Sequence, residues 1–150
     1  MSNIYEIIGR QVEKRNKRYF EELKDEVGYR QPLLRDLNKL REVREIFCEV
    51  QNIPLEDVLS KGYSRYVSWN KLKFIAVCYK LYAPETLIEG ATSGNIPKLN
   101  AALAPVTGVN PKKIGEKSRK SLFSYWHYRF FREVVDEICS RVINKLQITE

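Results

Sequence analysis

The chain has 150 residues, of which 43% are hydrophobic and 11% aromatic, and it carries a formal net charge of +7. This composition is typical of one folded domain, or of two small ones that share a core, and excludes a disordered chain. No apolar run approaches the roughly 20 residues needed to cross a bilayer. The N-terminus also lacks the continuous apolar core of a signal peptide. We therefore expect a cytoplasmic protein with no membrane partner.

Helical patterns account for the first half of the chain. Residues 3–27 predict an amphipathic first helix, because their apolar residues recur at mostly three- and four-residue steps. Residues 33–51 predict a second helix of the same kind. A proline turn, a short helical segment and a basic loop around 60–67 then lead to a helix that we expect Ser68 to cap and Tyr82 to end.

The second half predicts two short helices and one long one. The first short helix begins at Pro84 and ends before a turn at 93–95, and the second covers 96–106. Another proline turn and a basic loop, over 108–120, precede a long helix over 121–147. Strand-like alternation is absent throughout, so we predict an all-α fold with six to seven helices.

The aromatic string "FSYWHYRFF", residues 123–131, allows two interpretations. Exposed rings would stack on single-stranded bases. Helical spacing instead places some of them on an inner stripe of the last helix and leaves Tyr125, Tyr128 and Arg129 off it, at the surface. We favour the stripe, and expect a mostly buried core that includes Trp69, Phe74, Phe123, Trp126, Phe130 and Val134.

The three cysteines, Cys48, Cys78 and Cys139, fall within apolar helical patterns far apart in the sequence. We expect core residues with reduced thiols rather than disulfides. With a single histidine in the chain, we expect no metal site and no cofactor. Neither paired carboxylates nor a nucleophile beside a base stands out, so we do not expect an enzyme and predict no catalytic residue.

The two halves of the chain align without a gap at an offset of 56 residues, which pairs Leu40 with Ile96 and Val58 with Ile114. Lys61 then pairs with Lys117, within matching loops. This alignment predicts a duplicated unit of helix, turn, basic loop and helix. The expected organisation is an N-terminal helix at 1–30, repeats at 33–82 and 96–148, and a short helix with a connector at 83–95.

The positive charge is concentrated in the same two loops. Residues 60–80 contain five lysines and arginines and no acid, and residues 98–120 contain only Glu116 as an acid. Clustered positive charge of this kind is typical of proteins that bind polyanions, most often nucleic acid. The alternative is that both loops are solvated connectors whose charge keeps the protein soluble.

The second loop also follows a recognisable order: a Gly-Val-x-Pro turn, an isoleucine, and a Lys-Ser-Arg-Lys run before a helix. The residues of this pattern are Gly108, Val109, Pro111, Ile114, Lys117, Ser118, Arg119 and Lys120. Over about thirty residues the chain thus resembles the DNA-binding domain of the bacterial replication initiator DnaA, which belongs to a Trp-repressor-like class. The resemblance implies that residues 117–120 lie against the DNA backbone and minor groove. That family's base-reading Asp-His-Thr-Thr helix-turn-helix does not follow here, so sequence-specific readout and initiator function are not implied.

These observations predict a non-enzymatic protein that binds double-stranded DNA through two basic loops, as a regulator or as an accessory protein of replication or of a mobile element. The expected binding residues are Lys61, Arg65, Lys71, Lys73, Lys112, Lys113, Lys117, Ser118, Arg119 and Lys120. The competing hypothesis is a structural subunit of a phage or mobile element. In that case the first helix would dock on a partner or on a second copy of the chain.

Overall fold

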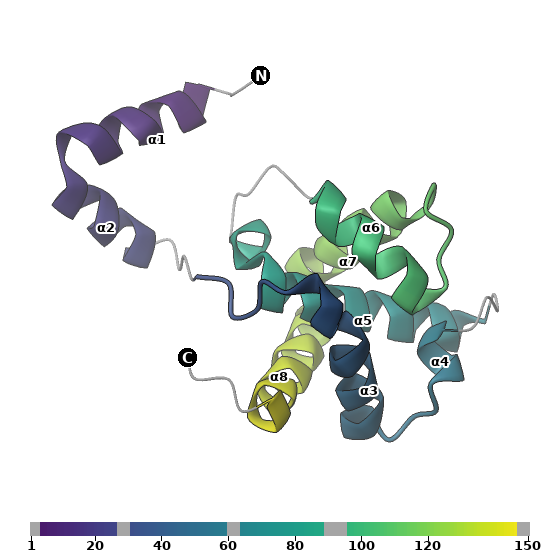
Figure 1. Ribbon diagram of the computed structural model, residues 1–150. Coiled ribbons are helices and arrows are strands. Elements are labelled where there is room, and N and C mark those ends of the chain that lie inside the picture. The colour runs from purple at the N-terminus through teal and green to yellow at the C-terminus, as the bar shows by residue number, and fades with distance from the viewer. Residues whose placement is uncertain (1–3, 27–30, 60–63, 89–95, 147–150) are drawn as a thin grey trace. The chain divides into compact units, whose positions relative to one another are not determined.

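The structure is a computed structural model that describes residues 4–26, 31–59, 64–88 and 96–146. Within these ranges the fold is all-helical, as predicted, with eight α-helices, two short 3₁₀ helices and no strand (Figure 1). The number of α-helices exceeds the expected six to seven partly because two of the expected long helices are each divided in two. The chain forms two compact units, Met1–Gln31 and Pro32–Glu150.

The first unit consists of α1 (Ile4–Arg15) and α2 (Lys17–Glu26) in place of one helix over 3–27. Asn16 separates them, and its side-chain oxygen accepts a hydrogen bond from the Tyr19 amide at 3.0 Å. Asparagine commonly begins a helix in this way, because its side chain satisfies an amide in the first turn. The helical periodicity continues across the break, so the apolar pattern alone did not reveal it.

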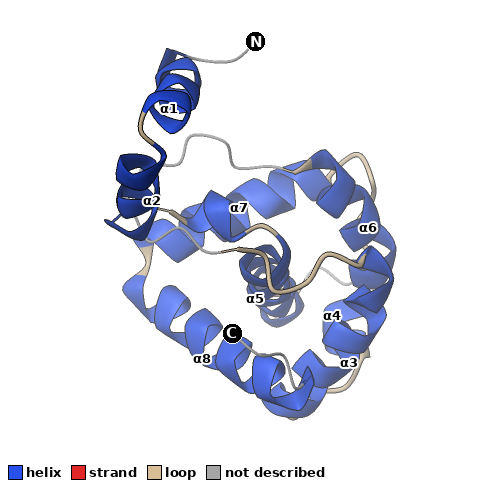
Figure 2. Cartoon of the chain, turned by 60° about the vertical axis from the view of Figure 1, so that its left-hand side comes forward, coloured by secondary structure: helices blue, strands red, loops and turns tan. Residues whose placement is uncertain are grey.

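The second unit is built around α5 (Arg65–Tyr82), whose side chains are buried on most sides. It contacts α3 (Leu40–Gln51), α4 (Glu56–Leu59), α6 (Pro97–Thr107), α7 (Ile114–His127) and α8 (Arg129–Leu146). Figure 2 shows α5 nearly end-on, with these helices around it. The 3₁₀ helices η1 (Leu37–Lys39) and η2 (Pro84–Leu87) precede α3 and follow α5.

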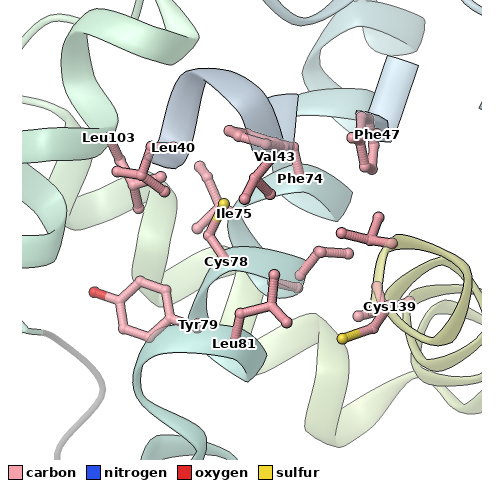
Figure 3. Close-up of a cluster of buried hydrophobic side chains, with 14 of the residues drawn as sticks. Leu40, Val43, Phe47, Phe74, Ile75, Cys78, Tyr79, Leu81, Leu103 and Cys139 are labelled. Atoms are coloured by element: carbon pink, nitrogen blue, oxygen red, sulfur yellow. The ribbon is translucent and has the colours of Figure 1, made fainter. Parts of the chain in front are cut away.

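The core consists of apolar side chains from α5 and the helices around it. Phe47 and Phe74 pack edge to face with ring centroids 5.3 Å apart, and Ile75 and Leu103 are fully buried members of the same core cluster (Figure 3). The burial of Phe74 was predicted. Cys48, Cys78 and Cys139 are buried as reduced thiols, also as expected.

Helix α5 begins four residues earlier than predicted. Ser64, rather than Ser68, is its N-cap, and the Ser64 hydroxyl accepts a hydrogen bond from the Val67 amide at 3.1 Å. Both serines precede helical sequence, so the capping pattern alone did not distinguish them. Ser68 lies in the first turn of the helix instead.

The expected long C-terminal helix is interrupted at Tyr128, which has an extended backbone (φ −117°, ψ 103°) between α7 and α8. The interruption shifts the buried positions, so the predicted inner stripe is wrong for Phe123 and Phe130, which are 54% and 72% exposed. Tyr125, expected at the surface, is buried, and so is Phe131. Three further residues of the predicted core, Trp69, Trp126 and Val134, are only partly covered.

The predicted duplication matches one pair of helices. Helix α3 ends at Asn52 (φ 53°) and α6 ends at Gly108 (φ 68°), two left-handed caps separated by the expected offset of 56 residues. After the caps the halves differ, because α5 is continuous where the aligned residues of the second half contain the break at Tyr128. The duplication therefore stays a prediction.

The neighbouring rings of Phe130 and Phe131 provide a matched test of the core. Phe131 is fully buried and packs edge to face on Trp69 at 4.9 Å, whereas Phe130 is exposed. Phe131→Ala should lower the free energy of unfolding by roughly 3–5 kcal/mol, and Phe130→Ala should change it by less than about 0.5 kcal/mol. Urea denaturation of both variants measures this difference. Equal losses would show that the register of α8 is wrong.

Candidate nucleic-acid interface

Helix α7 contains the second of the two predicted basic loops. The turn before it is set by Asn110, whose side-chain oxygen accepts the Lys112 amide at 2.9 Å and whose carbonyl accepts the amides of Lys113 and Ile114 at 2.8 and 3.0 Å. Helix formation therefore begins at Ile114, within the range 108–120 predicted as turn and loop. Residues 117–120 are helical, and the predicted loop conformation is wrong.

One face of α7 packs against the rest of the second unit through apolar residues and small serines. The Ser121 hydroxyl donates to the Leu72 carbonyl of α5 at 2.6 Å. Such a bond requires the two helices to approach closely, which a small side chain allows. The buried residues of this face are Ile114, Ser118, Ser121, Leu122, Ser124 and Tyr125.

Ser118 belongs to a buried polar network rather than to the surface. Its side chain is 0% exposed, and its hydroxyl donates to the side-chain oxygen of Asn100 at 2.7 Å. The Tyr79 hydroxyl donates to the same oxygen at 2.6 Å and accepts the Ile96 amide at the start of α6. Buried polar groups need such partners. The Ser118 hydroxyl is therefore inaccessible and already bonded, which leaves it without a free group for the predicted DNA contact.

Lys71 is also buried, at 5% exposure, and its ammonium donates to the Thr107 carbonyl at the end of α6 at 2.5 Å. Arg44 donates to the preceding carbonyl, that of Val106, at 3.1 Å. Cations are favourable at the negative end of a helix. Burial, and then the nearby Lys117 ammonium, lower the pKa of Lys71 below its ordinary value. Its ammonium is therefore used inside the fold and is not at the surface where the predicted DNA contact would need it.

The next predicted binding residues, three of them outside α7 and Lys117 on it, differ in how they are placed. Lys73 is half-buried and lies 3.4 Å from the Gln51 side-chain oxygen, and burial lowers its pKa. Arg65 is exposed in the first turn of α5, whereas Lys61 lies outside the described residues. Lys117, on α7, is half-buried and donates to the Ser68 hydroxyl at 3.3 Å, which brings α7 beside the first turns of α5.

The remaining cations lie along the exposed side of α7 and of the turn before it. We call this surface the outer face of α7. It consists of Lys112, Lys113, Glu116, Arg119, Lys120, Phe123 and His127, all of them exposed. Glu116 is its single acid and lies 3.6 Å from Lys120, with both side chains largely solvated. A solvated pair of this kind is weak, so it leaves both groups able to exchange partners.

Phe123 and His127 are the part of this face that the sequence did not assign to a site. Their ring centroids lie 3.9 Å apart, and the Tyr128 ring lies 6.2 Å from Phe123. The periodic serines at 118, 121 and 124 were the signal that could have identified them. Those small residues mark the buried side of α7, so Phe123 must lie opposite.

Comparison of the chain with protein-family models, curated protein sequences and solved structures found no match. None of the described helices has the length and hydropathy that crossing a bilayer requires. Among the residues with described positions, no group of three histidine, cysteine or acidic side chains is arranged to hold a metal ion.

The different environments of Lys71 and Lys120 give a testable contrast. Lys71→Ala should destabilise the protein by roughly 1–3 kcal/mol, because it leaves the Thr107 carbonyl without its charged donor. Lys120→Ala should change stability by less than about 0.5 kcal/mol, since its side chain is solvated. Thermal and urea unfolding at neutral pH measure both values. If Lys71→Ala were as stable as the unmodified protein, its placement at the end of α6 would be contradicted.

Proposed function

We propose that this protein is a non-enzymatic DNA-binding protein, acting as a regulator or as an accessory protein of replication or of a mobile element. It contacts the phosphate backbone through the outer face of α7. The observation that carries this proposal is a run of exposed cations at the start of α7, with Lys112 and Lys113 in the turn before the helix, Arg119 and Lys120 on its exposed side, and a single acid among them. Phosphate contacts by lysine and arginine release bound counterions, which favours association without any reading of bases.

The spacing of these cations suits a polyanion. The helical part of this run, from Ile114 to Lys120, extends about 9 Å along the axis of α7, a distance over which a nucleic-acid strand presents about two to three phosphates. Arg65, exposed about one helical turn before Ser68 of α5, is a further candidate contact, because Ser68 bonds Lys117 of α7. The proposed surface is therefore smaller than the two predicted loops, since Lys71 and Ser118 are excluded from it.

The resemblance to the DnaA DNA-binding domain supports only part of this surface. Of the residues that it places on the DNA backbone, Arg119 and Lys120 are exposed here, whereas Ser118 is buried and Lys117 is half-buried. The proposal therefore depends on the exposed cations themselves.

The test is a titration of random-sequence duplex DNA at increasing salt concentration. Affinity should fall by roughly 0.9 log units per phosphate contact for each tenfold rise in salt. Arg119→Ala combined with Lys120→Ala should weaken binding to all sequences alike and flatten the salt slope by up to about two contacts. The fold should survive this change, because both side chains are exposed.

The matched control is Arg141→Ala combined with Lys145→Ala, which removes the same charge from exposed positions of α8. Residue 141 lies about 18 Å along α8 from its N-terminus. Both double variants weakening the binding equally would mean that net charge alone attracts DNA. That result, or no salt-dependent binding by the unmodified protein, would refute the proposal.

A second candidate function, assembly through the first unit, is favoured by α1. None of its residues is buried, and Ile4, Ile7 and Ile8, which share one side of the helix, are 60%, 45% and 51% exposed. An uncovered aliphatic stripe is typical of a helix that packs on another protein surface. Docking on a second copy or on another subunit would cover it.

Sedimentation of the full chain tests self-assembly. If α1 mediates it, the unmodified protein should be larger than a monomer, and Ile4→Ser combined with Ile8→Ser should return it to one. Glu13→Ser is the control, since Glu13 is exposed on the side of α1 opposite the isoleucines. A monomeric unmodified protein at high concentration would contradict assembly with a second copy.

A further inference from the structure

The aromatic end of the outer face of α7 is a surface feature that backbone contacts do not explain. Phe123, His127 and Tyr128 are exposed and adjoin one another, with ring centroids 3.9 and 6.2 Å from that of Phe123. More than half of the surface of both Phe123 and Tyr128 is accessible. A group of large rings left in solvent commonly marks a binding surface.

The fold holds these rings on a fixed support. On the opposite side of α7, the Tyr125 hydroxyl donates to the Asp136 carboxylate of α8 at 2.7 Å. Lys80 of α5 donates to the same oxygen at 2.6 Å. These bonds join α5, α7 and α8 across the break at Tyr128. Phe123 and His127 therefore project from a helix that is held in place on its other side. Because this support is already ordered, less conformational entropy is lost when a ligand binds the two rings.

Positive charge lies directly beside the rings. Arg119 and Lys120 precede Phe123 by about one helical turn, or roughly 5 Å along the axis. A phosphate at these two cations would bring an attached base within reach of the Phe123 ring. An aliphatic protein partner gives no reason for a ring cluster to adjoin cations, whereas a nucleotide has both an anion and a flat aromatic base.

We propose that Phe123, together with His127 and Tyr128, stacks on unpaired bases of a single-stranded nucleic acid whose phosphates lie along Lys112–Lys120. This inference rests on the proposed function and specifies its ligand. Within a duplex, the face of each base is covered by the next base pair, so side chains cannot stack on it without unstacking the helix. The aromatic end thus favours single strands, while the cationic end binds any phosphate backbone.

The experiment compares oligothymidine, oligouridine of equal length and a blunt duplex, each with a fluorescent label, binding to the full chain. The unmodified protein should bind the single strands more tightly than the duplex. Phe123→Ala should weaken single-strand binding about fivefold or more, the loss of roughly one stacked base. It should leave duplex binding and the salt slope unchanged, because no phosphate contact is removed. The two single strands distinguish DNA from RNA as the source of the bases.

Two further substitutions separate stacking from general apolar contact. Phe123→Tyr keeps an aromatic face and should retain the affinity for single strands, whereas Phe123→Leu keeps an apolar side chain but should not. Tyr19→Ala, at an exposed ring of the first unit, is the control and should have no effect.

The inference would be overturned if Phe123→Leu kept the full affinity for single strands. It would also be overturned if Phe123→Ala weakened duplex and single-strand binding equally. An unchanged affinity for single strands in that variant would overturn it as well. If Phe123→Ala instead altered only the mass of the protein in solution, the rings would be a protein contact and the inference would be wrong. The proposed function has its own test. It is refuted if the variant with both Arg119→Ala and Lys120→Ala binds DNA with the same affinity and salt dependence as the unmodified protein.

Discussion

The arrangement of the second unit depends on the buried C-terminal end of α6. The last carbonyls of a helix have no partner within it and must find one elsewhere when water is excluded. Here Arg44 and Lys71 supply charged donors to Val106 and Thr107. The chain then turns at Gly108 with φ 68°, where a Cβ would collide with the Leu59 carbonyl. Only glycine fits both requirements, and this turn directs the chain into α7.

This constraint divides the basic residues into two groups with different roles. Lys71 and Arg44 are used inside the fold, where their charges stabilise the end of a helix. The serines of α7 and the network of Tyr79, Asn100 and Ser118 fix the side of α7 that faces inward. The cations and rings on the other side are left exposed together. Their common orientation follows from these internal bonds and cannot be inferred from charge density alone.

The sequence predicted the helical class, the burial of Phe74 and the proline turn before α7, because each depends on local periodicity or turn chemistry. It did not predict the break at Tyr128, because no proline or glycine marks it and the apolar periodicity runs across it. The assignment of Lys117–Lys120 to a loop had a related cause. Serine and lysine in alternation resemble a solvated loop, and only the packing of Ser118 and Ser121 against α5 and α6 distinguishes a helix.

Contact between nucleic acid and the outer face of α7 can be observed residue by residue. Amide NMR spectra of the isotopically labelled protein, recorded as oligothymidine is added at low salt, report which residues the ligand approaches. The largest shifts should fall on residues 112–128, with those of Phe123 and His127 among them, and should diminish as salt is added. Shifts concentrated on the far end of α8 or on the first unit, or no shifts at all, would show that the outer face of α7 is not the contact surface.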